Sequence, residues 1–243
     1  MAQGKVYIGT SGWHYRHWRG NFYPPQCAGS DFLDFYSRRL AAVEINNTFY
    51  HLPEKESLAA LHRQTPDDFL FAVKASRFIT HMKKLKGAAE HVDNFLERIA
   101  PLAEKTGPIL FQLPPRWHCN VERLQEFISH LPGTHRYAFE FRDESWFTDS
   151  VYATLAKSNA AFCLYHLEGR MTPKEITADF VYIRLHGPGK AYEGDYATRD
   201  LAGWAGAISA WRRQDRDVYV FFDNDQNGYA PGNALELQNM LEK

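Results

Sequence analysis

The sequence contains little cysteine. Its 243 residues include only Cys27, Cys119 and Cys163, and no two of them stand in a Cys-x-x-Cys spacing. An odd number without paired spacing disfavours a disulfide framework and a zinc-ribbon site, and it fits a reducing compartment. Cys163 lies in an apolar run, which is typical of a small core residue rather than of a nucleophile.

The sequence also carries almost no net charge and has no long apolar run. Its 28 Lys and Arg residues nearly balance 29 Asp and Glu residues, which leaves a formal charge of −1. This balance removes the broad electrostatic case for a nucleic-acid or membrane-surface protein. No stretch approaches the roughly 20 apolar residues of a membrane span, and the N-terminus has no apolar signal-peptide segment. We therefore expect a cytoplasmic protein without a membrane partner.

What the chain does contain is an alternation of short apolar segments with stretches of helical periodicity. No linker or repeat interrupts it. Eight strands are predicted, over residues 6–9, 42–46, 69–74, 109–113, 137–141, 161–165, 180–186 and 218–222. Helices are predicted between them, with Ser30 and Asn120 as N-caps, while residues 171–177 form at most a short helix. Eight strand–helix units in this length predict one α/β domain over residues 1–243, a single (β/α)8 TIM barrel with a parallel sheet.

Nearly every predicted strand ends in a polar residue. A parallel barrel collects the C-termini of its strands at one mouth, where its chemistry is seated. Because side chains alternate along a strand, the face opposite the apolar one must look into the barrel. That face carries Glu44, Lys74, Gln112, Glu140, Arg142, Arg184 and His186. Buried charges must pair, bind a ligand or meet water, so an internal ion-pair network is the alternative to a ligand site.

A loop rich in aromatic residues follows the first strand, over residues 11–24. Its rings alternate with Arg and His, a pattern that suits stacking on a sugar or base and binding of an anion. A hydrophobic plug over the barrel rim explains the pattern equally well. Trp117 and Trp146 follow other strand ends, and we expect several rings to line one cleft.

Six motifs give the chain a resemblance to a known family. They are Gly9-Thr10-Ser11-Gly12-Trp13, Asn47-Thr48-Phe49-Tyr50, Gln112-Leu113-Pro114-Pro115, Glu140-Phe141-Arg142 with Ser145-Trp146, Arg184-Leu185-His186-Gly187 and Phe222-Asp223-Asn224-Asp225. Their order over nearly the whole chain resembles the YecE-like family, also called domain of unknown function 72. The resemblance implies a TIM barrel and no settled activity. It also implies Asn at position 223, where this chain has Asp.

We predict that the mouth binds a small anionic or sugar-like ligand and performs metal-independent hydrolase or lyase chemistry without a cofactor. The candidate acid–base residues are Glu140, Glu44 and His186. The candidate ligand-binding residues are Ser11, Trp13, Tyr15, Asn46, Lys74, Gln112, Arg142, Trp146, Arg184, Asp223 and Asn224. We expect Glu140 and Arg142 to reach one ligand without necessarily pairing, so that Glu140→Gln weakens binding and leaves stability unchanged.

Two alternatives remain open. Glu44, Glu140, Asp223 and His186 could coordinate a cation, as in a metal-dependent phosphodiesterase or isomerase. Against this alternative, three cations share the same mouth, and the sequence has no His-x-His or His-Glu-x-x-His spacing. The other alternative is a non-catalytic protein that binds carbohydrate or nucleic acid through its aromatic loop and the basic residues Lys83, Lys84 and Lys86. Nucleic acid is the less favoured partner because the chain is nearly neutral.

Overall fold

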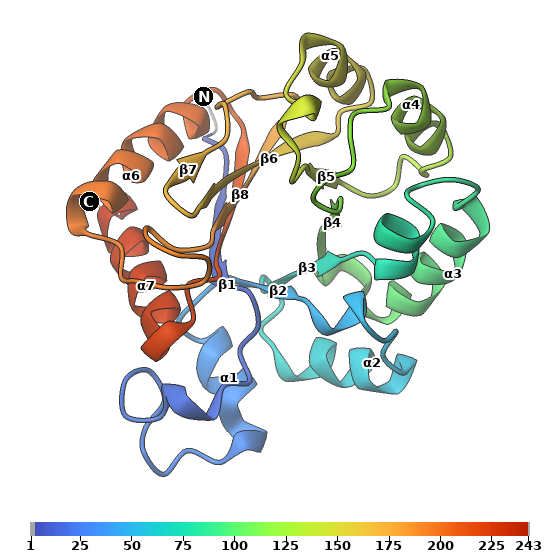
Figure 1. The fold of residues 1–243 in the computed structure, drawn as a ribbon. Coiled ribbons are helices and arrows are strands. Elements are labelled where there is room, and N and C mark those ends of the chain that lie inside the picture. Colours follow the sequence, from blue (N-terminus) through green and yellow to red (C-terminus); the bar gives the residue numbers. More distant parts are fainter. Residues whose placement is uncertain (1–2, 243) are drawn as a thin grey trace.

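A computed structural model of the chain describes residues 3–242 and contains the predicted barrel (Figure 1). Its strand order is β1-β9-β8-β6-β5-β4-β3-β2, and all neighbours along this path are parallel. An isolated parallel bridge between Ser11 and Glu44 joins the two end strands. The eight barrel strands are β1 Val6–Thr10, β2 Ala42–Ile45, β3 Leu70–Lys74, β4 Thr106–Gln112, β5 Tyr137–Glu140, β6 Ala161–Leu167, β8 Phe180–Leu185 and β9 Asp217–Phe222.

Helices surround the strands (Figure 1). They are α1 Phe32–Ser37, α2 Lys55–Gln64, α3 Ala89–Ile99, α4 Val121–Ser129, α5 Asp149–Lys157, α6 Thr198–Arg212 and α7 Tyr229–Leu241. The predicted cap of α4 is confirmed, because the Asn120 Oδ1 atom accepts a hydrogen bond from the Arg123 amide at 2.9 Å. The predicted cap at Ser30 is wrong. The α-helix begins at Phe32, and the Ser30 hydroxyl donates to Asp31 Oδ1 instead.

Residues 171–177, expected to form at most a short helix, contain no helix. The chain instead forms β7, Arg170–Met171, which pairs antiparallel with the end of β6. Glu168 and Gly169 connect the two strands, and both have positive φ, 52° and 71°. Two positive φ angles are the conformation that a two-residue hairpin turn requires.

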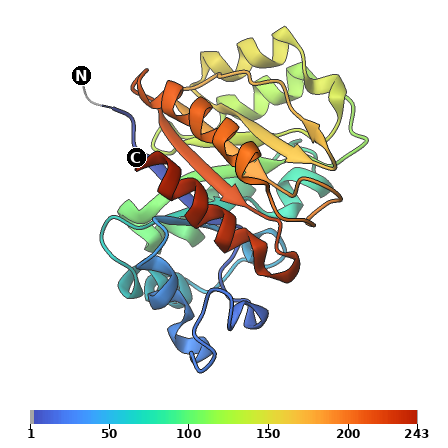
Figure 2. The same cartoon turned by 90° about the vertical axis from the view of Figure 1, so that its left-hand side faces the viewer.

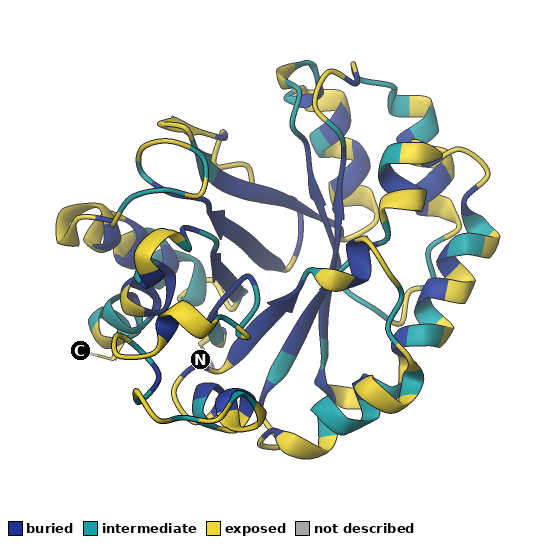
Figure 3. Cartoon of the chain, turned by 60° about the horizontal axis from the view of Figure 1, so that its bottom comes forward, coloured by how far each residue is buried: buried dark blue, intermediate teal, exposed yellow. Residues whose placement is uncertain are grey.

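The inside of the barrel is filled as the parity of the strands predicts. Below the polar mouth it is lined largely by small residues, among them Ala42, Ala72, Ala138, Ala161 and Cys163. A larger apolar layer lies between the sheet and the helices. Figure 3 shows the strands buried and the helices exposed on their outer faces. Cys163 is fully buried, as expected.

The aromatic loop packs mainly on itself and on α1. Trp18 and Tyr23 are buried, and the Tyr23 ring stacks on Phe32 with 4.0 Å between ring centroids. This N-terminal segment projects from the barrel on the side of α1 (Figure 2). Its buried rings extend the main apolar core, while Trp13 and Tyr15 remain partly exposed.

No helix within residues 3–242 is both long and apolar enough to cross a bilayer.

Candidate functional site

Arg184, near the end of β8, stands at the centre of the polar mouth. Its side chain is 1% exposed. The Nη2 atom donates to Glu44 Oε1 at 2.7 Å, and Nη1 donates to Glu140 Oε2 at 2.8 Å. A third carboxylate, Asp223 Oδ2, lies 3.3 Å from Nη2. One guanidinium thus collects carboxylates that β2, β5 and the end of β9 bring to the same place.

Glu44 is fully buried and has a complete set of donors. Besides Arg184, the Ser11 hydroxyl donates to its Oε1 atom at 2.8 Å, and the Tyr182 hydroxyl donates to Oε2 at 2.7 Å. Burial and the neighbouring Glu44 charge raise the pKa of Tyr182, so this phenol stays a donor. The arrangement satisfies a buried carboxylate that would otherwise be costly.

Glu140 is also fully buried, and it pairs directly with Arg142. Gln112 Nε2 donates to the same oxygen, Oε1, at 2.8 Å. Burial alone would raise the pKa of Glu140, but the charges of Arg142 and then Arg184 hold it well below its ordinary value. The sequence left open whether Glu140 and Arg142 pair. They do, because β5 ends at Glu140 and the Arg142 guanidinium folds back onto it.

His186 links Arg142 to Asp223. Its Nδ1 atom lies 3.0 Å from Asp223 Oδ2, and its Nε2 atom lies 3.1 Å from Arg142 Nη2. An arginine can only donate, so Nε2 accepts, and the proton on Nδ1 is donated to the carboxylate. The two neighbours therefore select the neutral Nδ1–H form of the ring.

Three charged groups, Lys74, Arg142 and Asp223, form the open edge of this network. The Nζ atom of Lys74, at the end of β3, has no hydrogen-bond or ion-pair partner within residues 3–242 and lies 4.3 Å from the centroid of the Phe49 ring. Burial and then the charge of Arg184 lower the pKa of Lys74 to about 8. Arg142 is 11% exposed and its Nη1 atom has no described protein partner.

Asp223 completes the open edge. Its side chain is 19% exposed, and its Oδ1 atom accepts from no donor in the described chain. Burial would raise the pKa of Asp223, but the hydrogen bond from His186 and the charge of Arg184 lower it. Lys74 contributes to the same lowering, which places the ammonium and the carboxylate within electrostatic reach of each other.

Arg142 also connects the network to a cavity. A cavity of about 440 Å³ lies above the ends of β5 and β6, and Arg142 and Tyr165 line it. The guanidinium carbon of Arg142 lies 5.2 Å from the centroid of the Tyr165 ring, which supports it from one side. Small-molecule sites have this form, a concave space with a few placed polar groups.

Two residues of the mouth were not predicted. His81 lies in a π-helical turn, Phe78–Met82, and burial followed by the charge of Lys74 lowers its pKa to about 4. Tyr192 stands edge-on to His186 with 5.5 Å between ring centroids. Both lie in connections that follow a strand, where the sequence has no periodic pattern. The sequence feature that could have identified them is their position shortly after Lys74 and His186.

Several predicted ligand-binding residues lie away from the open edge. Trp146 is 1% exposed, stacks on Phe141 and donates to the Trp117 carbonyl at 2.6 Å, so it belongs to the core. Asn224 is buried and donates to Gly194 O and Asn233 Oδ1. These two side chains stabilise the rim rather than face a ligand.

The remaining predicted residues lie close to the mouth. The Tyr15 hydroxyl donates to the Ser11 carbonyl at 2.9 Å. Burial and the charge of Asp223 raise the pKa of Tyr15. Trp13 is partly exposed, and its carbonyl accepts from Tyr23. Asn46 follows β2, and its Oδ1 atom is buried without a hydrogen-bond partner in the described chain.

The acidic residues of the mouth are arranged around Arg184 rather than around an open centre. Residues 3–242 contain no group of three or more His, Cys, Asp or Glu side chains placed to hold a metal ion. The four residues of the metal alternative, Glu44, Glu140, Asp223 and His186, instead direct their acceptor or donor atoms at each other and at arginine.

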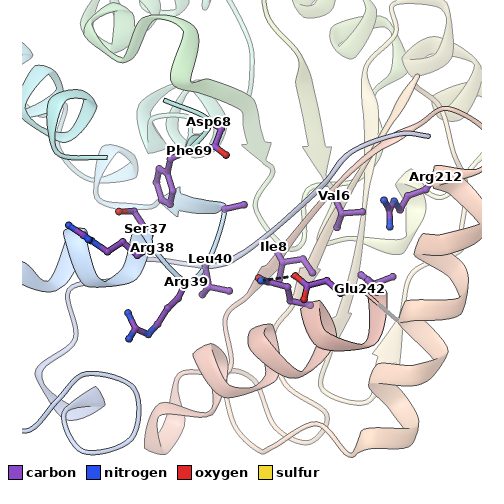
Figure 4. A pocket seen from close by; sticks show the side chains of 13 residues that line it. Val6, Ile8, Ser37, Arg38, Arg39, Leu40, Asp68, Phe69, Arg212 and Glu242 are labelled. Carbon is purple, nitrogen blue, oxygen red and sulfur yellow. Dashed lines mark hydrogen bonds between the residues drawn. The ribbon is translucent and has the colours of Figure 1, made fainter. Parts of the chain in front are cut away.

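Another cavity, of about 480 Å³, lies at the opposite end of the barrel (Figure 4). Val6, Asp68 and Phe69 line it near the starts of β1 and β3, and Arg212 and Glu242 line it from the ends of α6 and α7. Active sites of parallel barrels are built at the C-terminal ends of the strands. This cavity is therefore not the candidate site.

Comparisons with known proteins agree with the fold. The family model described as "Protein of unknown function DUF72" matches residues 7–243. UPF0759 protein YunF of Bacillus subtilis is 26% identical over 271 residues, covering 98% of this chain and 95% of its own. UPF0759 protein YecE of Escherichia coli is 34% identical over 146 residues, covering 58% of this chain and 50% of its own.

Solved structures are similar over the whole barrel. A DUF72 family protein from Thermotoga maritima superposes with a TM-score of 0.89 at 31% identity, covering 98% of this chain and all of the other. A DUF72 family protein from Enterococcus faecalis gives 0.84 at 21% identity, with coverages of 98% and 96%. The names of these relatives state no activity.

Proposed function

The chain belongs to the family of proteins of unknown function DUF72, and we propose that it is a metal-independent acid–base enzyme that binds a small ligand carrying an anionic group. One observation carries the proposal. Glu44, Glu140 and Arg184 form buried ion pairs, in which Arg184 Nε lacks an acceptor within residues 3–242. Beside them, Lys74, Arg142 and Asp223 keep polar atoms at the open edge without a described protein partner. A purely structural ion-pair network would have used these atoms.

The charge of the open edge supports an anionic ligand. The six charged groups of the mouth balance, but the three that reach solvent are two cations and one carboxylate. Arg142 Nη1 is a donor beside a cavity of about 440 Å³, and the Lys74 ammonium carries three further protons. Together they suit a carboxylate or phosphate group.

Lys74 and Asp223 are the groups suited to proton transfer. A general base works best when its pKa lies near the working pH, and the pKa of Lys74, lowered to about 8, meets that condition. Asp223 stays ionised and is oriented by His186. In this proposal Glu44 and Glu140 hold Arg184 in place, because both carboxylates are buried and have a complete set of donors.

Ligand-observed NMR with a panel of small carboxylates, phosphates and neutral polyols tests the proposal. We expect anionic members to bind, and Arg142→Lys to weaken them about tenfold, or ~1.4 kcal/mol, by removing Nη1. Arg170→Lys is the matched control, because Arg170 lines the same cavity but is 81% exposed and pairs only with exposed Glu144. Equal loss in the two variants, or equal binding of neutral polyols, would contradict the proposal.

A further inference from the structure

Lys74 differs from the other enclosed lysine of the described chain. Lys105 is 2% exposed, and its Nζ atom donates to the His62 and Thr65 carbonyls at 2.7 and 2.8 Å. Lys74 is partly exposed and has no such acceptor in the described chain. It lies in a mouth that contains three carboxylates, but those carboxylates are bound to Arg184, Arg142 and His186.

The surroundings of Lys74 make its proton easier to lose than that of an ordinary lysine. The face of the Phe49 ring, 4.3 Å from Nζ, attracts the ammonium, but burial and then the charge of Arg184 lower the pKa of Lys74 to about 8. Glu140, Glu44 and Asp223 act in the opposite direction but are partly neutralised by their own partners. Desolvation and a neighbouring cation are the two conditions that activate a lysine as a nucleophile.

We propose that Lys74 condenses with the carbonyl group of a small anionic aldehyde or ketone, forming an imine at the barrel mouth. This inference rests on the proposed function and deepens it by naming the substrate class. Phe49 supplies an apolar wall beside the nucleophile, and Arg142 Nη1 is the donor available for the anionic end of the substrate. Lys74 projects from the C-terminal end of a barrel strand, where catalytic residues of this fold are placed.

The step balances without an added reactant. Near its pKa a fraction of Lys74 has given its proton to solvent water, and the amine lone pair then attacks the carbonyl carbon. A C–N bond forms, the C=O π bond breaks, and the oxygen takes a proton from nitrogen to give a carbinolamine. The hydroxyl oxygen then takes a proton from solvent, and the C–O bond breaks as the nitrogen lone pair forms the C=N bond, so that the oxygen departs as water. Overall, an ammonium and a carbonyl compound become a protonated imine and water, with no change in oxidation state. The protonated imine can then accept the electrons released when a neighbouring C–H or C–C bond breaks.

Trapping with borohydride tests this directly. The full-length protein is incubated with glyoxylate, a small anionic aldehyde, reduced with sodium borohydride, and examined by intact mass and peptide mapping. A reduced imine adds the mass of the probe less one oxygen atom. We expect the adduct on Lys74 in the wild-type protein and an increase in its rate as the pH rises toward 8. His81 also faces this site, but its pKa of about 4 keeps it out of that range.

Lys74→Arg should abolish the main adduct, whereas Lys83→Arg should not. Lys83 is the matched control because its Nζ also lies over an aromatic ring, Phe78, at 5.4 Å, but the residue is exposed. An adduct spread over surface lysines, or a wild-type map without Lys74, overturns the inference even if Lys74→Arg fails to fold. Should glyoxylate still bind by NMR in that case, with the sensitivity to Arg142→Lys intact, the proposed function stands and only the imine is rejected.

Discussion

At the scale of single residues, the mouth contains charges of two kinds. Glu44, Glu140 and Arg184 are buried and ion-paired with one another, although Arg184 Nε has no acceptor in the described chain. Lys74 and Asp223 are partly exposed and remain open to a ligand. Removing one member of a sealed pair leaves an uncompensated buried charge, which costs far more than losing an exposed ion pair. The two kinds of residue therefore respond differently to substitution.

Glu140→Gln should destabilise the protein by ~3 kcal/mol, because Arg142 loses its buried carboxylate and Arg184 loses one of the three carboxylates around it. Urea unfolding at pH 7 measures this. Glu144→Gln is the control, since Glu144 is 77% exposed and its loss should stay within ~0.5 kcal/mol. The sequence alone suggested unchanged stability for Glu140→Gln; finding that result would return Glu140 to the role of a ligand-facing acid or base.

Lys74→Met should stabilise the protein at pH 7, by ~1–2 kcal/mol after allowance for solvent screening. The folded state lowers the pKa of Lys74 from 10.5 to about 8. Below pH 8 both folded and unfolded chains carry the proton, so the full cost of the buried charge is present. Between about pH 8 and 10.5 only the unfolded chain keeps the proton. The free energy of unfolding of the wild-type protein therefore rises relative to that of the variant.

Urea unfolding of both proteins at several pH values from 7 to 10 measures the difference. The advantage of Lys74→Met should shrink as the pH rises through this window. An advantage that is absent at pH 7, or constant with pH, would show that the folded protein does not disfavour the charged form of Lys74.

At the scale of elements, the sequence predicted structure well where one local signal was strong. Short apolar runs located all eight barrel strands, and alternation assigned Glu44, Glu140 and Arg184 to the inside. Asn120 was identified as a cap because a helical pattern follows it directly. The hairpin at Glu168-Gly169 and the turn that folds Arg142 onto Glu140 were missed, since both depend on backbone angles and tertiary contacts that a residue pattern does not specify.

Asn120→Ala should destabilise the protein by ~1 kcal/mol, because the Arg123 amide loses its acceptor at the start of α4. Thermal unfolding measures the effect. Ser30→Ala is the matched comparison, since Ser30 occupies a similar position in the sequence but caps no helix. Equal destabilisation by the two substitutions would show that the loss at position 120 does not come from capping.

At the scale of the whole molecule, the eight strands bring residues from positions 11 to 223 into one mouth. The sequence could predict this convergence, because a closed parallel barrel places all strand ends together. It could not predict which charges pair, since pairing depends on side-chain directions across neighbouring strands. The sequence offered Glu140 as an acid–base candidate and Lys74 as a ligand-binding candidate, and only the structure separates the open lysine from the buried glutamate.

The two cavities at opposite ends of the barrel allow the central claim to be tested by a single crystal structure. Figure 4 shows the cavity at the end away from the mouth. Crystals would be soaked with the tightest anionic ligand from the NMR panel. We predict that its anionic group lies within hydrogen-bond distance of Lys74 Nζ and Arg142 Nη1 at the strand C-termini. Ligand bound instead between Val6 and Arg212 at the other end, with only water at the mouth, would contradict the account.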